Sequence, residues 1–276
     1  MLARATTWWT ILRISLEERL VYRGDFAIGT LMRFLPIVTQ IFLWLAVFDA
    51  ASRGEIEGYE ISGYGYSDMV AYYLLAMVVR AFSSMPDLAL GIALSIRNGD
   101  IKKFMIQPID LVGFLLLTRI AHKLVYYSVA IGPFALVFYL CRGYFSGWPD
   151  PDIMASFCLS LVLGFLLGFF MEAAIGMMGF WFLEVSSLLF VYMLFNFFFS
   201  GQMFPLDFLP APWDTLFQLI PLQYLAFFPA AIFLGKVQGP ELVNGLLIEA
   251  GWVVFFILVS RVALRRGMNR YSGYGG

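Results

Sequence analysis

Long apolar runs recur along the chain, and only short polar segments separate them. A helix needs about 20 apolar residues to cross the ~30 Å hydrocarbon core of a bilayer, and several of these runs reach that length. Of the 276 residues, 61% are hydrophobic and 13% are charged, whereas soluble domains carry roughly 25% charged residues. The chain is therefore predicted to be an integral membrane protein built of helices, because helices satisfy their own backbone hydrogen bonds in lipid.

We predict an all-α integral membrane fold that forms one transmembrane domain over residues 1–276. The six predicted spans are residues 26–48, 69–90, 113–140, 153–171, 180–200 and 242–263. The apolar stretch before the last span, residues 201–235, is interrupted by Pro205, Pro210, Pro212, Pro221 and Pro229. It is too broken for one spanning helix, so we expect an external re-entrant hairpin of two short helices.

Residues 1–24 are predicted to form an amphipathic helix at the membrane surface. With ~3.6 residues per turn, an apolar arc of about 120° contains Trp8, Trp9, Leu12, Leu16 and Leu20. Arg19 falls inside this arc, where its long stem lets the guanidinium group reach the headgroups. Tryptophan prefers the same depth, which favours an interfacial helix. Gly24 is expected to mark the break before the first span.

The distribution of cations predicts the orientation of the chain. With six spans, 14 of the 18 Lys and Arg residues lie on the side that holds both termini, three lie on the other side, and Arg80 lies within a span. The positive-inside rule then predicts that both termini are cytoplasmic. Under this topology the link at residues 172–179 is cytoplasmic, although it contains no Lys or Arg.

A charged segment, residues 95–111, separates the second and third predicted spans. It contains Arg97, Lys102 and Lys103 together with Gly99 and Pro108, so it is expected to lie outside the hydrocarbon on the cytoplasmic side. Two interpretations follow from the residues alone. The segment either connects two spans, or it contains a short helix through which a soluble partner moves the membrane part.

The motifs of several enzyme classes are missing from the sequence. There is no G-x-x-x-x-G-K-[ST] loop for phosphate and no H-E-x-x-H, and one histidine cannot build a metal cluster. The chain is thus expected to have no ATPase site and no bound metal or cofactor of its own. A net charge of −1 also provides no basic field for nucleic acid. For Cys141 and Cys158, both a disulfide and simple apolar packing stay open.

Ionisable and polar residues inside or beside the spans are the next candidates, because charge in lipid is costly. Arg80 and Asp87 are seven residues apart, so on one helix they would share a face. They either line a polar path or are structural charges with partners. Glu172 and Glu184 either pair with the central cations or a partner subunit, or are solvated at the membrane edge. Asn196 is expected to hydrogen-bond across helices.

The order of these elements resembles the membrane subunit of type-2 ATP-binding-cassette exporters. The stretches that carry the resemblance are Arg97-Asn98-Gly99-Asp100-Ile101-Lys102-Lys103-Phe104-Met105-Ile106-Gln107-Pro108, Ser200-Gly201-Gln202-Met203-Phe204-Pro205-Leu206-Asp207-Phe208-Leu209-Pro210, and Ile220-Pro221-Leu222-Gln223-Tyr224. They resemble the family's cytoplasmic coupling helix and its external re-entrant hairpin. The sequence Gly179-Phe180-Trp181-Phe182 further resembles a poorly characterised bacterial branch.

The resemblance implies how such a chain works. Two permeases, identical or homologous, would pair in the bacterial inner membrane, and separate ATPase subunits that bind ATP and Mg would drive them. The expected ATPase-coupling residues are Arg97, Asn98, Gly99, Asp100, Lys102, Lys103, Gln107 and Pro108, with Glu17, Glu18 and Arg19 on the interface helix. The external hairpin, with Gly201, Pro205, Pro210 and Pro221, would cap the exit.

The substrate is expected to be amphipathic or lipid-like, because the spans are mostly apolar and lack a dense charged lining. The alternative function is a self-contained ion-coupled secondary transporter or channel that uses Arg80 and Asp87. A third is a membrane-embedded enzyme or assembly factor.

The topology predicts that residues 201–221 face the outside. In a chain whose two cysteines are replaced by serine, Gln202→Cys should react with a membrane-impermeant thiol reagent added externally. Labelling of intact cells or spheroplasts measures this. Protection from the external reagent, with reaction only after the membrane is opened, would contradict the predicted orientation.

Overall fold

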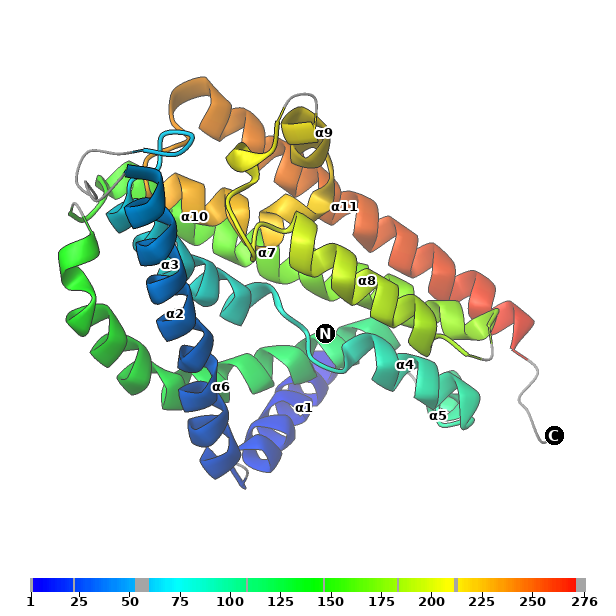
Figure 1. Cartoon of the computed structure of the whole chain (residues 1–276). Coiled ribbons are helices and arrows are strands. Elements are labelled where there is room, and N and C mark those ends of the chain that lie inside the picture. Colours follow the sequence, from blue (N-terminus) through cyan, green and yellow to red (C-terminus); the bar gives the residue numbers. More distant parts are fainter. Residues whose placement is uncertain are drawn as a thin grey trace. The chain divides into compact units, whose positions relative to one another are not determined.

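The computed structural model describes residues 2–21, 23–52, 60–107, 109–145, 147–182, 184–210 and 213–271. The part of the chain that the structure describes is 82% helix and contains no strand beyond one isolated bridge between Ile61 and Tyr64. The predicted all-helical class is therefore confirmed. Figure 1 shows the succession of helices along the chain.

Five helical segments within the described ranges are long and apolar enough to cross a membrane: Phe34–Ser52, Tyr66–Arg97, Leu111–Leu140, Pro151–Phe180 and Gly239–Arg270. The helix in place of the predicted fifth span is α8, Ser186–Phe199, which has 14 residues. At ~1.5 Å per residue α8 extends about 21 Å, which is shorter than the hydrocarbon core. Six full spans thus stay a prediction.

The chain divides into two compact units, and the first contains residues 1–59, 65–71 and 104–146. It includes α1 (Leu2–Val21), α2 (Arg23–Ser52) and α6 (Leu111–Leu140). The Asp110 carboxylate caps α6 by accepting a hydrogen bond from Gly113 N at 2.7 Å. Trp8 of α1 lies against Gly113, where an added Cβ would come within 3.0 Å of the indole. The predicted surface helix therefore packs on α6 through Trp8.

The second unit, residues 60–64, 72–103 and 147–276, is organised around α7 (Pro151–Gly176). It also contains α4 (Leu88–Arg97), α8, α11 (Gly239–Arg270) and the one-turn helix η2 (Met177–Phe180). Glycines let neighbouring backbones approach α7. A Cβ at Gly168 would lie 2.2 Å from Ser83 O, and one at Gly176 would lie 2.7 Å from Ala89 O. The buried core around these contacts includes Leu167 and Met171.

The proline-broken stretch forms short helices: η3 (Leu206–Phe208), α9 (Trp213–Leu219), η4 (Pro221–Leu225) and α10 (Phe227–Phe233). Tyrosine hydroxyls tie its beginning to the chain before and within α3 (Tyr66–Ser83). Tyr64 donates to Asp207 Oδ2 at 2.9 Å, Tyr72 donates to Gly201 O, and Tyr73 donates to Met203 O. Gly201 has φ +85°, and an added Cβ would lie 2.6 Å from the Cβ of Phe227, so this position requires glycine.

The predicted second span is not one continuous helix. The helix α3 ends at Ser83, α4 begins at Leu88, and Asp87 between them has φ 59°. Pro86 lies in this break, where its missing N–H and fixed φ disfavour a continuous helix. The expectation that Arg80 and Asp87 share one helix face is therefore wrong, since it assumed helical geometry through the break.

The predicted link at residues 172–179 is also wrong. Its first five residues continue α7 to Gly176, and η2 follows directly. Gly176 at the end of α7 and Gly179 in η2 pack closely on α4, at Ala89 and Ala93. The chain between α7 and α8 turns only after Phe180.

The glycine contacts of α7 generate a stability prediction. Gly168→Ala should lower the free energy of unfolding by about 1–3 kcal/mol, because the new methyl group would overlap Ser83 O. Gly251→Ala on α11 is the matched control, since an added Cβ there has no atom within 4 Å. Thermal unfolding in detergent measures both variants. Equal stability of the two variants would contradict the packing described for α7.

Candidate functional site

The predicted coupling segment forms an exposed turn at the end of α4. The N–H of Asn98 donates to Leu94 O at 2.8 Å, and Gly99 has φ +86°. This left-handed conformation reverses the chain after the helix, as glycine commonly does at a helix C-terminus. Ile101 is buried beneath the turn at 1% exposure. The short helix α5, Lys102–Ile106, follows.

Most of the predicted coupling side chains lie at the surface. The exposed ones are Arg97, Asn98, Asp100, Lys102, Lys103 and Gln107. Gly99 is half-buried, and Pro108 lies outside the described residues. A segment between two long apolar helices thus presents both signs of charge to solvent, which suits docking by a polar surface.

Arg97 forms an ion pair with Glu184, with 3.6 Å between Nη1 and Oε2. Of the two alternatives for Glu184, the structure therefore contains the pairing with a central cation. Hydrogen bonds from Ser186, and then the charge of Arg97, lower the pKa of Glu184 below its usual value. The ion pair stabilises the fold at pH values above the ordinary carboxylate pKa. This stabilisation is lost as the pH falls through the lowered pKa of Glu184. Both side chains are more than half exposed, so this contribution is small.

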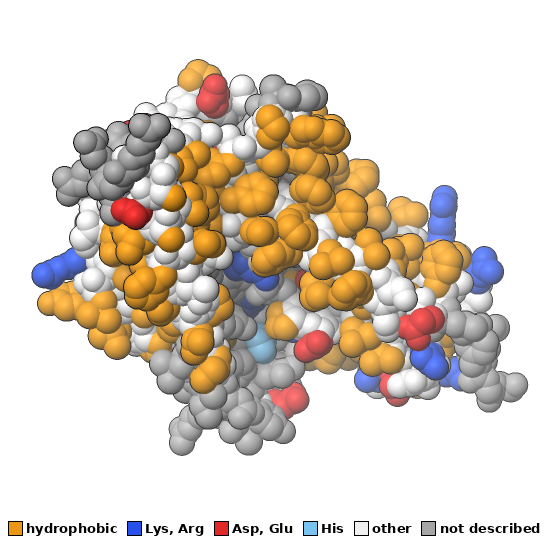
Figure 2. Space-filling view, in the orientation of Figure 1, with side chains coloured by type: hydrophobic (Ala, Val, Ile, Leu, Met, Phe, Trp, Pro, Cys, Tyr) orange, Lys and Arg blue, Asp and Glu red, His pale blue; other side chains and the backbone are white. Residues whose placement is uncertain are grey.

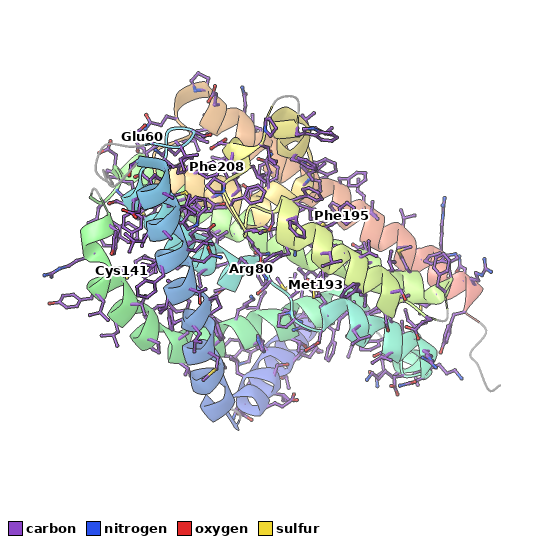
Figure 3. The ribbon with its side chains drawn as sticks, in the orientation of Figure 1. Glu60, Arg80, Cys141, Met193, Phe195 and Phe208 are labelled. Atoms are coloured by element: carbon purple, nitrogen blue, oxygen red, sulfur yellow. The ribbon has the colours of Figure 1, made fainter. Side chains whose placement is uncertain are left out.

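Three polar residues of the second unit, on α3, α7 and α8, lie near one another. Arg80 is half-buried in the last turn of α3 (Figure 3), and Glu172 is half-buried on α7. Both charges act on the hydroxyl of Tyr192, which belongs to α8. The structure therefore groups Arg80 with Glu172 and Tyr192, while Asp87 is exposed in the break between α3 and α4.

The remaining predicted residues lie apart from these groups. Glu17 pairs within α1 with Arg13 at 2.9 Å, and Glu18 is exposed. The side chain of Arg19 lies outside the described residues. Asn196 Oδ1 is buried, and no described residue hydrogen-bonds to it. The expected hydrogen bond of this oxygen to another helix is therefore absent from the described part of the chain.

On the hairpin, Pro205 is buried and precedes η3, whereas Pro210 is exposed. Pro221 occupies the first turn of η4, where its missing N–H needs no partner.

The sequence reasoning missed a buried acid on the last span. Glu249 of α11 is 0% exposed, and Ser160 Oγ of α7 donates to its Oε2 at 2.8 Å. Its other oxygen, Oε1, is buried and accepts no hydrogen bond from any residue that the structure describes. One signal was present in the sequence, because Glu249 is the single acid within the apolar run 242–263. Its partner lies 89 residues away and could not be inferred from spacing.

Tyr271, after the end of α11, was also missed. Its hydroxyl donates to Ile96 O at 3.1 Å, so it reaches the turn that carries the coupling residues. Neither cysteine forms a disulfide. No group of three His, Cys, Asp or Glu side chains suited to a metal occurs in the part of the chain that the structure describes.

Helices of spanning length, a charged turn between two of them and a proline-broken stretch of short helices are the features of a multi-pass membrane protein. A family described as ABC-2 family transporter protein matches residues 34–275, which include every helix from most of α2 to the end of α11. The chain therefore belongs to the ABC-2 transporter family, whose members are membrane components of ABC transporters. A comparison with curated proteins found no match.

The Glu249–Ser160 contact generates a second stability prediction. Glu249→Ala should lower the free energy of unfolding by about 2–4 kcal/mol, because it leaves a cavity and removes the partner of Ser160. Glu249→Gln keeps the size and an oxygen acceptor, so its loss should stay below about 1 kcal/mol. Thermal unfolding in detergent compares these variants with Glu241→Ala, which is exposed in the first turn of α11. A Glu249→Ala variant as stable as Glu241→Ala would refute a packing role.

Proposed function

We propose that this ABC-2 family chain is the permease subunit of an ATP-driven exporter. The observation that carries the proposal is the exposed, charged turn between α4 and α5, in a chain whose family implies ATPase partner subunits. The turn is the docking site of an ATPase subunit. When the ATPase subunits bind ATP they close, and this closure displaces the turn and thereby the membrane helices.

The docking contacts are polar. Asp100 attracts cations of the ATPase, and Lys102 and Lys103 attract its carboxylates, because exposed charges at an interface chiefly select and orient the partner. Arg97, Asn98, Gly99, Gln107 and Pro108 shape the same surface. Glu17, Glu18 and Arg19 of α1 supply the contacts of the interface helix.

ATP and Mg bind to the partner subunits, because this sequence has no phosphate-binding loop. The excess of cations on the side that holds both termini supports a cytoplasmic location for them, with the complex in a bacterial inner membrane. The hairpin with Gly201, Pro205, Pro210 and Pro221 caps the outer end of the path.

A second permease, identical or homologous, completes the path. The surface of α8 supports this arrangement, since none of its described residues is buried. Hydrophobic side chains gather on the face of the molecule where Figure 1 places α8 (Figure 2). Met193 and Phe195 are 56% and 53% exposed (Figure 3). Lipid or a partner helix covers such a face, and an amphipathic or lipid-like substrate matches its chemistry.

The grouping of Arg80, Glu172 and Tyr192 supports an alternative function, a secondary transporter driven by an ion gradient. Purification of the chain from its native membrane distinguishes the two. A stoichiometric ATPase with a phosphate-binding loop supports the exporter. Its absence, together with transport that follows a proton or sodium gradient, would favour the secondary transporter.

Charge reversal on the turn tests the docking site directly. Asp100→Arg, and separately Lys102→Glu with Lys103→Glu, should leave membrane insertion intact and weaken ATPase binding by about tenfold, equivalent to ~1.4 kcal/mol. Co-elution with the ATPase and coupled ATP hydrolysis measure the effect. Glu241→Lys, a charge reversal at the other end of α11, is the matched control. Unchanged co-elution and hydrolysis in both turn variants would eliminate this docking site.

A further inference from the structure

The last carbonyl groups of α4 receive a hydrogen bond from the far end of the chain. Ile96 O accepts from Gly99 N at 3.2 Å within the turn, and also from the Tyr271 hydroxyl at 3.1 Å. Carbonyls at a helix C-terminus have no partner within their helix, so an added donor stabilises the end of the helix. Tyr271 lies 175 residues further along the chain.

The ring of Tyr271 makes the same connection through packing. It lies edge-on to Phe180 of η2, with 6.0 Å between the ring centroids and 82° between the planes. The Tyr271 oxygen is also 3.6 Å from the position of an added Cβ at Gly99. The side chain therefore contacts the turn with its hydroxyl and η2 with its ring.

Glycines bring the neighbouring backbones against Phe180 and α4. An added Cβ at Gly267 of α11 would lie 2.2 Å from the Phe180 ring, and one at Gly179 would lie 3.1 Å from Ala93 Cα of α4. The ends of α4 and α11 and the segment η2 thus form one packed block within the second unit (Figure 1). This block contains residues 93–101, 177–180 and 267–271.

We propose that Tyr271 is a positioning residue that fastens the ATPase-docking turn to the end of the last span, so that displacement of the turn moves α11. The inference rests on the proposed function, because it takes the turn as the docking site. The Arg97–Glu184 pair is exposed and provides only a weak second tie. The directional hydrogen bond and the ring contact of Tyr271 prevent the turn from sliding along α11.

The first test measures whether the end of α4 and the end of α11 move together. In a cysteine-free chain, spin labels replace the exposed residues Leu94 and Arg266, which lie outside the docking contacts. The complex is purified with its ATPase and compared with and without Mg and a non-hydrolysable ATP analogue. We expect one narrow distance distribution in both states for the native residue, and a broader, nucleotide-dependent distribution for Tyr271→Phe and Tyr271→Ala. Distributions that stay narrow in both variants would overturn the inference.

The second test separates transmission from docking. Tyr271→Ala should lower kcat of permease-dependent ATP hydrolysis about tenfold, and Tyr271→Phe about threefold, because the ring contact remains in the latter. The KM for ATP and the amount of co-eluting ATPase should stay unchanged, which a merely unfolded turn would not permit. Tyr139→Phe, an exposed tyrosine in the last turn of α6, is the matched control.

The outcomes distinguish failure of the proposed function from failure of the role assigned to Tyr271. If the native chain brings no ATPase, the proposed function fails and this inference fails with it. If the ATPase co-elutes with native chain and variants alike, and kcat and the distance distributions are also unchanged, only the role of Tyr271 is refuted.

Discussion

The close approach of backbone to backbone along α7 is the contact on which the second unit depends. Three glycines of α7 leave room for backbone oxygens of neighbouring segments, where any other residue would place a side chain. Gly168 faces Ser83 O, Gly176 faces Ala89 O, and Gly164 faces Tyr224 O. Apolar side chains gain little by leaving lipid, so membrane helices associate through such fitted surfaces. The end of α3 at Ser83 and the segment η4 with Tyr224 both pack on α7, at Gly168 and Gly164.

This packing determines which charges lie at the surface and which lie inside. The turn after α4 stays exposed because the helix packs on α7 and η2 up to Ile96 and then reverses at Gly99. Glu249 is enclosed because α11 runs along α7, with Ser160 opposite. The surface charges are available to a partner subunit, whereas the enclosed acid serves contact between spans.

Sequence reasoning succeeded where composition alone decides the outcome. The third predicted span, residues 113–140, agrees closely with α6, Leu111–Leu140, because a long, mostly apolar segment in lipid satisfies its backbone hydrogen bonds as a helix. It failed where tertiary contacts decide. Apolar residues lie on both sides of the break after Ser83, and residues 172–176 continue α7 to a glycine that packs against Ala89 of α4. The partners of Glu249 and Tyr271 are 89 and 175 residues distant, beyond any local pattern.

Three tyrosine hydroxyls hold the start of the proline-broken stretch in place. Two of them donate to main-chain oxygens, Gly201 O and Met203 O. A carbonyl oxygen is present whatever the side chain. The half-exposed side chain of Met203 is therefore not constrained by the anchor, whereas the tyrosines and the left-handed glycine are. Exposed side chains of this stretch can therefore be exchanged without loss of the hydrogen bonds that tie its backbone to Tyr72 and Tyr73.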